Sequence, residues 1–77
     1  MKIRLYTIYD ACNFSKRCDS YFDEDIEIKQ GKKCVNGKSV LGLFTLNLLE
    51  PLDATIISGD KEVKENFYSF LKIWAIA

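Results

Sequence analysis

The sequence predicts one α+β domain in which a four-stranded antiparallel sheet is covered on one face by three helices. Three observations predict this class. Segments that alternate polar and apolar residues are interleaved with segments of helical periodicity, in the order βαββαβα. The chain has 77 residues, the length of one domain, so residues 1–77 are expected to fold as one unit. A hydrophobic content of 48% is enough for a core and argues against disorder.

The first strand and the first helix are predicted near the N-terminus. Residues 2–8 alternate polar and apolar, which favours a strand whose Ile3 and Leu5 face the core. Asp10 is expected to cap the following helix, because its carboxylate can accept from free N–H groups of the first turn. This helix is expected to run to about residue 22. Its buried face is expected to carry Phe14, Cys18 and either Tyr21 or Phe22.

A β-hairpin is predicted next. Residues 25–30 alternate again, with Ile26 and Ile28 facing inward. Gly31-Lys32 is expected to turn the chain, and residues 33–35 to return as a short antiparallel strand.

The rest of the chain is predicted to add a helix, a strand and a last helix. Ser39 is expected to open a short, very apolar helix that ends near Asn47. The β-branched residues in 53–58 favour a fourth strand, and Gly59-Asp60 ends it and starts a helix. The apolar stripe of this last helix is expected to comprise Val63, Phe67, Phe70 or Leu71, and Trp74.

The residue counts argue against several classes of function. The chain has no histidine, which removes the usual general base and the commonest metal ligand, so we do not expect an enzyme. Eleven basic residues balance eleven acidic ones, which argues against a nucleic-acid-binding protein. The three cysteines lack the spacing of a zinc site and are odd in number, so we expect no metal, no other cofactor and no disulfide framework.

The expected compartment is the cytoplasm. The N-terminal residues contain neither a long apolar run nor a small-residue cleavage site, so they do not resemble a signal peptide. The longest apolar stretch, residues 40–49, is interrupted and too short for a membrane span. We therefore expect no insertion into a membrane.

Residues 36–46 carry a resemblance to a known family. They read Asn-Gly-Lys-Ser-Val-Leu-Gly-Leu-Phe-Thr-Leu. This is similar to the second-helix signature of the HPr family, the small phosphocarriers of the bacterial sugar phosphotransferase system: Asn, any residue, Lys-Ser, two apolar residues, Gly and further apolar residues. The order of the elements fits as well, most closely from about Phe22 to Trp74. The resemblance implies an HPr-like open-faced two-layer sandwich with strand order 1-4-2-3 and three helices on one face.

The sequence departs from the family at the site that defines it. HPr proteins carry Gly-Ile/Leu-His-Ala-Arg-Pro between the first strand and the first helix, where the histidine accepts the phosphoryl group. Here the junction reads Thr-Ile-Tyr-Asp-Ala-Cys over residues 7–12, and Asp10 stands where the family has a cation. The resemblance therefore implies the fold without the phosphocarrier activity. We expect a non-catalytic regulatory or interaction protein.

Ser39 is the candidate site of regulation. In many HPr proteins a dedicated kinase phosphorylates the matching serine, so the resemblance implies a phosphorylation site here. A phosphate at a helix N-terminus would meet free N–H groups, and the neighbouring Lys38 would support the anion. The alternative is that Ser39 only caps the helix.

Four apolar residues are candidates for a partner-binding surface, because a helix that is apolar nearly all round cannot bury every side. Leu43 and Leu46 are expected to enter the core. The residues left for a partner are Val40, Leu41, Phe44 and Leu48. In HPr the matching residues meet enzyme I, sugar permease domains and a transcriptional regulator, and the resemblance implies partners of this kind, with HPr kinase among them. A homodimer surface and a more complete core are the alternatives.

Cys12 is the candidate for a substitute phosphoryl acceptor. A thiol in the first turn of a helix can act as a nucleophile, so a phosphocysteine carrier is an alternative function. A small, half-buried core residue is the other interpretation of Cys12. A third interpretation of the protein is a degenerate member with an unrelated binding role on the same fold.

Overall fold

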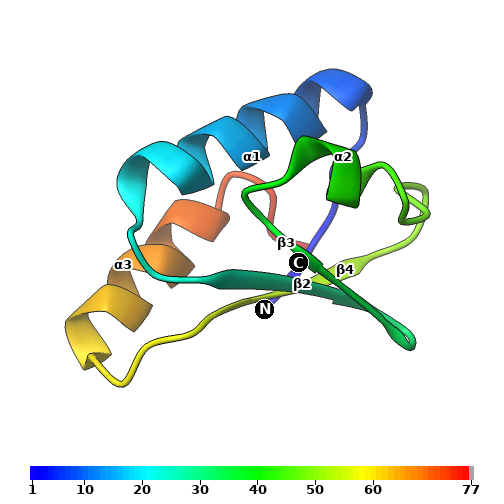
Figure 1. Ribbon diagram of the computed structural model, residues 1–77. Coiled ribbons are helices and arrows are strands. Elements are labelled where there is room, and N and C mark those ends of the chain that lie inside the picture. Colours follow the sequence, from blue (N-terminus) through cyan, green and yellow to red (C-terminus); the bar gives the residue numbers. More distant parts are fainter. Residues whose placement is uncertain (77) are drawn as a thin grey trace.

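The structure is a computed structural model that describes residues 1–76, and it has the predicted α+β architecture (Figure 1). The four strands form one antiparallel sheet in the order β1-β4-β2-β3, which confirms the expected fold class and strand order. The elements in chain order are β1 (Lys2–Ile3), α1 (Ile8–Tyr21), β2 (Ile26–Gln30), β3 (Lys33–Asn36), α2 (Val40–Leu43), β4 (Leu52–Ile56) and α3 (Lys61–Leu71).

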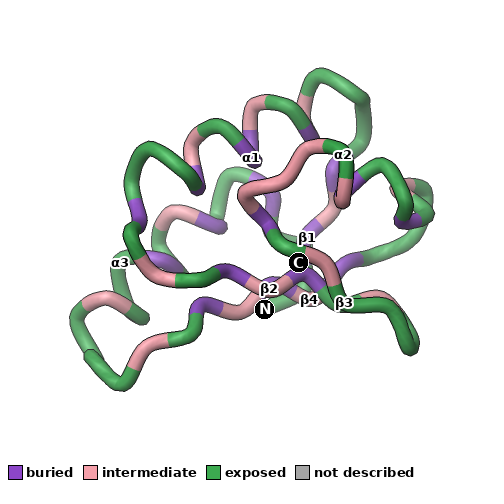
Figure 2. The backbone as a smooth tube through the Cα atoms, viewed as in Figure 1, coloured by how far each residue is buried: buried purple, intermediate pink, exposed green. Residues whose placement is uncertain are grey.

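The sheet has one buried face and one open face, as an open-faced sandwich requires (Figure 2). Ile26 and Ile28 are buried as predicted, and the register places them opposite Ile56 and Ala54, which are also buried. The residues between them point to the other face and are polar and at least partly exposed. They are Glu27, Lys29, Asp53 and Thr55.

Aromatic side chains of α1, α3 and the residues that follow each helix fill the space between the helices and the sheet. Phe22 meets Phe67 edge to face, with ring centroids 5.4 Å apart, and Phe14 meets Trp74 in the same way at 5.1 Å. Burial decides between the two pairs of residues that the sequence left open, one in each helix region. Phe22 is buried and Tyr21 is exposed, while Leu71 is buried and Phe70 only partly so.

The first strand is shorter than predicted and the first helix begins earlier. Thr7, not Asp10, is the N-cap of α1, because its Oγ1 accepts from the Asp10 N–H at 3.0 Å. Asp10 therefore lies inside the first turn. The alternating pattern continues to the buried Leu5, but the chain has left the sheet after Ile3.

The C-terminal residues occupy the outer edge of β1. The Arg4 N–H donates to the Trp74 carbonyl at 3.0 Å, the Ile76 N–H donates to the Lys2 carbonyl at 3.2 Å, and Ile3 and Ala75 form an antiparallel bridge. Trp74 is buried as predicted, but it lies beyond the end of α3 rather than on its stripe. These contacts satisfy backbone groups that an edge strand would otherwise leave unpaired.

The second helix ends after a single turn, so the prediction of a helix to Asn47 is wrong. The Thr45 hydroxyl donates to the Gly42 carbonyl at 2.7 Å, and the Thr45 and Leu46 N–H groups bond three residues back instead of four. The Asn47 Oδ1 then accepts from the Leu49 N–H at 3.1 Å, which turns the chain. Leu43 and Leu46 are nevertheless buried as predicted.

The last strand and helix agree closely with the sequence. β4 begins at Leu52 and ends at Ile56, slightly earlier than predicted. Asp60 caps α3, since its Oδ1 accepts from the Glu62 N–H at 2.9 Å. Among residues 1–76, no helix has the length and apolar character to span a membrane.

Candidate functional site

Each residue of the Asn-Gly-Lys-Ser motif has a structural role in the connection from β3 to α2. The Asn36 Oδ1 accepts from the Lys38 N–H at 2.9 Å, and the Asn36 carbonyl accepts from the Ser39 N–H at 3.0 Å. Gly37 is pressed against Ile26, since a Cβ on Gly37 would lie 2.7 Å from the Ile26 Cγ2. The motif therefore holds the start of α2 against β2 and β3.

Ser39 and Lys38 each have a structural partner. The Ser39 Oγ accepts from the Gly42 N–H at 3.1 Å, which makes this half-buried serine the N-cap of α2. The Lys38 Nζ donates to the carbonyl of Phe22, the C-cap residue of α1. A cation at the C-terminal end of a helix stabilises its unpaired carbonyl groups, so Lys38 ties the end of α1 to the start of α2.

The predicted partner-binding residues divide into two pairs. Leu41 is 76% exposed and Phe44 is 42% exposed, as expected for a surface. Val40 and Leu48 are half-buried, and Leu48 packs against the core.

The structure adds further apolar residues that sequence reasoning missed. Tyr6 precedes the N-cap of α1 and is 67% exposed, while Ile8 and Tyr9 in the first turn are 70% and 78% exposed; Leu49 is 76% exposed. α2 packs against α1 (Figure 1), and the hydrogen bond from Arg4 to the Leu49 carbonyl joins the chain before α1 to the chain after α2. We call this set the α1–α2 surface. It comprises Tyr6, Ile8, Tyr9, Leu41, Phe44 and Leu49.

Arg4 connects two parts of the α1–α2 surface. Its Nη2 donates to the Leu49 carbonyl at 2.7 Å, and its guanidinium lies 4.7 Å from the centre of the Tyr6 ring. The sequence carries a signal for Tyr9. The buried residues of α1 are Ala11, Phe14, Ser15 and Cys18, and at about 3.6 residues per turn Tyr9 falls on the opposite face of the helix.

A recess of about 250 Å³ between α1 and the start of α2 brings three of the predicted site residues together: Cys12, Lys38 and Val40. Lys16 and Asp19 contribute charged groups to the same recess. Cys12 is exposed, but it lies in the second turn of α1 because the helix begins at Ile8. The expected place in the first turn is therefore wrong, and the free N–H groups of the helix start do not surround the thiol.

Cys18, nearly two turns further along α1 than Cys12, is a core residue. Burial raises the pKa of its thiol to about 12, and the nearby Lys38 ammonium offsets only part of that effect. The thiol is therefore protonated at neutral pH and unreactive as a nucleophile.

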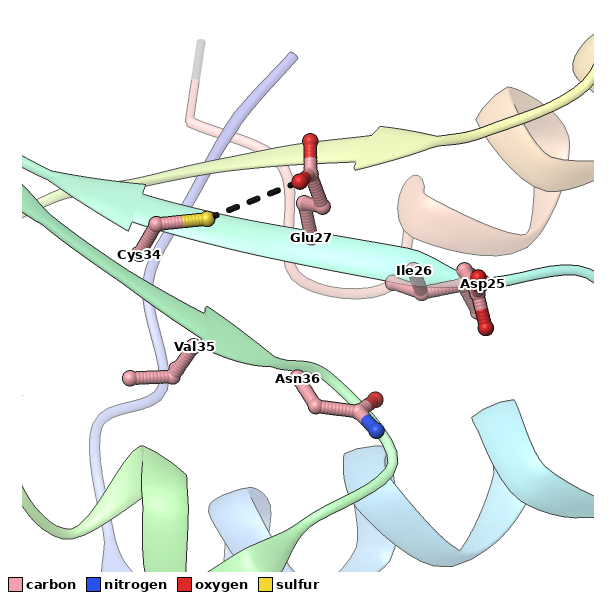
Figure 3. Close-up of a pocket in the computed structure, with 6 residues that line it drawn as sticks. All are labelled: Asp25, Ile26, Glu27, Cys34, Val35 and Asn36. Carbon is pink, nitrogen blue, oxygen red and sulfur yellow. Dashed lines mark hydrogen bonds between the residues drawn. The ribbon is translucent and has the colours of Figure 1, made fainter.

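A second recess, of about 340 Å³, lies beside β2 and β3 and contains none of the predicted site residues (Figure 3). There the Cys34 Sγ lies 3.7 Å from the Glu27 Oε2, to which it donates. In the part of the chain that the structure describes, no three Cys, Asp or Glu side chains are grouped so that they could hold a metal ion.

Comparisons of the chain with models of protein families, with curated proteins and with solved structures find no match. The structure shows an α+β sandwich with strand order 1-4-2-3, which is consistent with an HPr-like fold.

Proposed function

We propose that the protein is a cytoplasmic, HPr-like interaction protein of the phosphotransferase system that does not carry phosphoryl groups on histidine. The observation that carries this proposal is the α1–α2 surface, where large apolar side chains such as Tyr9 and Leu41 are mostly exposed. Clusters of this kind mark sites of protein binding. The motif at residues 36–39 and the strand order support the relation to HPr.

The start of α1 supports the absence of a phosphocarrier activity. The chain has no histidine, and the carboxylate of Asp10 lies in the first turn of α1, where the family binds phosphate. A carboxylate repels a phosphoryl group and opposes the positive potential of a helix N-terminus. By the resemblance, the partners are enzyme I, sugar permease domains or a transcriptional regulator.

Phosphorylation of Ser39 is the regulatory part of the proposal. A phosphate on its Oγ would disturb the cap on Gly42, and Lys38 would have to leave the Phe22 carbonyl to reach it. Incubation with HPr kinase and ATP, followed by mass spectrometry, tests this part. Phosphorylation of the chain with Ser39, but not of the Ser39→Ala variant, supports this part. A Ser39 that stays unphosphorylated contradicts it.

Binding to enzyme I tests the interaction directly. We expect the unmodified chain to bind and Leu41→Asp to bind at least about tenfold more weakly, because it places a charge in an apolar contact. Ile57→Asp is the matched control, since Ile57 is 50% exposed and directly follows β4, in the chain that leads to α3. Equal weakening by both variants would contradict a role for this surface.

Phosphoryl transfer separates the remaining alternatives. With labelled phosphoenolpyruvate and enzyme I, we expect no label on the chain. Label that disappears in Cys12→Ser would instead support a phosphocysteine carrier. A chain that neither binds enzyme I nor takes up label favours an unrelated binding role on this fold, and sedimentation then tests a homodimer.

A further inference from the structure

The segment from Phe44 to Glu50 presents two residues of the α1–α2 surface, Phe44 and Leu49, without belonging to a helix or a strand. Its internal hydrogen bonds are short-range, such as that from the Glu50 N–H to the Asn47 carbonyl at 3.1 Å. Bonds of this kind set local turns, and they do not place the segment relative to the sheet.

Side chains from outside the segment place it instead: Arg4 holds it at the Leu49 carbonyl, and two residues of the β2–β3 hairpin hold the part before Leu49. The Gln30 Nε2 donates to the Asn47 carbonyl at 2.7 Å, and its Oε1 accepts from the Asn47 N–H at 2.8 Å. The Lys33 Nζ donates to the Thr45 carbonyl at 2.9 Å. Gln30 and Lys33 are directly paired across the hairpin, so the end of the hairpin holds the segment at two further points.

We propose that Gln30 and Lys33 are positioning residues of the α1–α2 surface. They act through the backbone of Thr45 and Asn47, and so hold Phe44 and Leu49 in one arrangement before a partner binds. Pre-organisation of this kind raises affinity because less conformational freedom is lost on binding. The inference rests on the proposed function for the role of the surface, while the placement of the segment can be tested without any partner.

Amide hydrogen exchange provides the first readout. In Gln30→Met, which keeps the length of the side chain and removes both hydrogen bonds, we expect the Asn47 amide to exchange roughly tenfold faster. Lys33→Met and Lys32→Met remove the same charge from the same hairpin, but only Lys33 bonds to the segment. We therefore expect the amides of the segment to exchange faster in Lys33→Met than in the unsubstituted chain. We expect Lys32→Met and Lys33→Arg to exchange at the same rate as the unsubstituted chain.

Affinity for enzyme I provides the second readout, which a purely structural role would leave unchanged. We expect the Gln30→Met and Lys33→Met variants to bind several-fold more weakly, while Lys32→Met and Lys33→Arg bind like the unmodified chain. Faster exchange with unchanged affinity would overturn the inference, as would unchanged exchange at Asn47. If the unmodified chain does not bind enzyme I, the proposed function fails, and exchange at Asn47 and Leu49 then decides the positioning alone.

Discussion

Gln30 and Asn47 are joined by two hydrogen bonds of opposite direction, between the side-chain amide of one and the backbone of the other. The amide of Gln30 thus takes the place of a neighbouring strand, satisfying a backbone donor and a backbone acceptor at once. This pairing holds the chain between α2 and β4 in place and lets residues 44–51 remain irregular beside a regular sheet.

Gly37→Ala should destabilise the fold, because the new methyl group would lie 2.7 Å from the Ile26 Cγ2. We expect a loss of about 1–3 kcal/mol in the free energy of unfolding. Gly59→Ala is the control, since a Cβ there meets nothing within 4 Å. Urea unfolding measures both, and a Gly37→Ala variant as stable as Gly59→Ala would contradict the close approach.

Ser39→Ala should remove the cap of α2 and lower the free energy of unfolding by about 1 kcal/mol. Ser39→Asp should keep most of that stability, because aspartate accepts the same hydrogen bond from the Gly42 N–H. Thermal unfolding of the two variants gives the comparison. Equal loss in both would show that the Oγ to Gly42 bond does not stabilise the helix.

The three cysteines should differ in reactivity toward a thiol reagent. Cys12 and Cys34 are exposed and should react in the native state, while Cys18 is buried and should react only after unfolding in urea. Mass spectrometry of the alkylated native protein counts the labels. Three labels without denaturant would place Cys18 outside the core.

Alkaline pH should destabilise the protein partly through Cys18. Its pKa is raised from 9.0 to about 12 on folding, so the folded state holds the proton more tightly. The contribution is therefore fully present below about pH 9 and is lost as the pH rises toward 12, by at most about 4 kcal/mol. Cys18→Ala should flatten the fall in stability above pH 9, and an unchanged slope would argue against the buried thiol.

The sheet could be predicted from the sequence because strand burial has a simple period. Ile26 and Ile28 alternate with polar residues, and that pattern alone fixes which face is buried. The end of α2 could not be predicted in the same way. The apolar run continues past Leu43, and the chain turns because of hydrogen bonds made by Thr45 and by the distant Gln30.

The candidate site, like the fold, could be predicted only where it depends on the apolar pattern. Leu41 and Phe44 follow from an excess of apolar residues that one short helix cannot bury. The exposure of Tyr6 and Tyr9 depends on where α1 begins, which in turn depends on the Thr7 hydroxyl rather than on the apolar pattern.

Titration of the isotope-labelled chain with unlabelled enzyme I, followed by backbone amide shifts, tests the central claim most directly. We expect the largest shifts at Tyr9, Leu41 and Phe44, on the α1–α2 surface, and none at Glu27 or Thr55 on the open face of the sheet. Shifts confined to the open face, or no shifts at all, would contradict an HPr-like interaction protein that binds through α1 and α2.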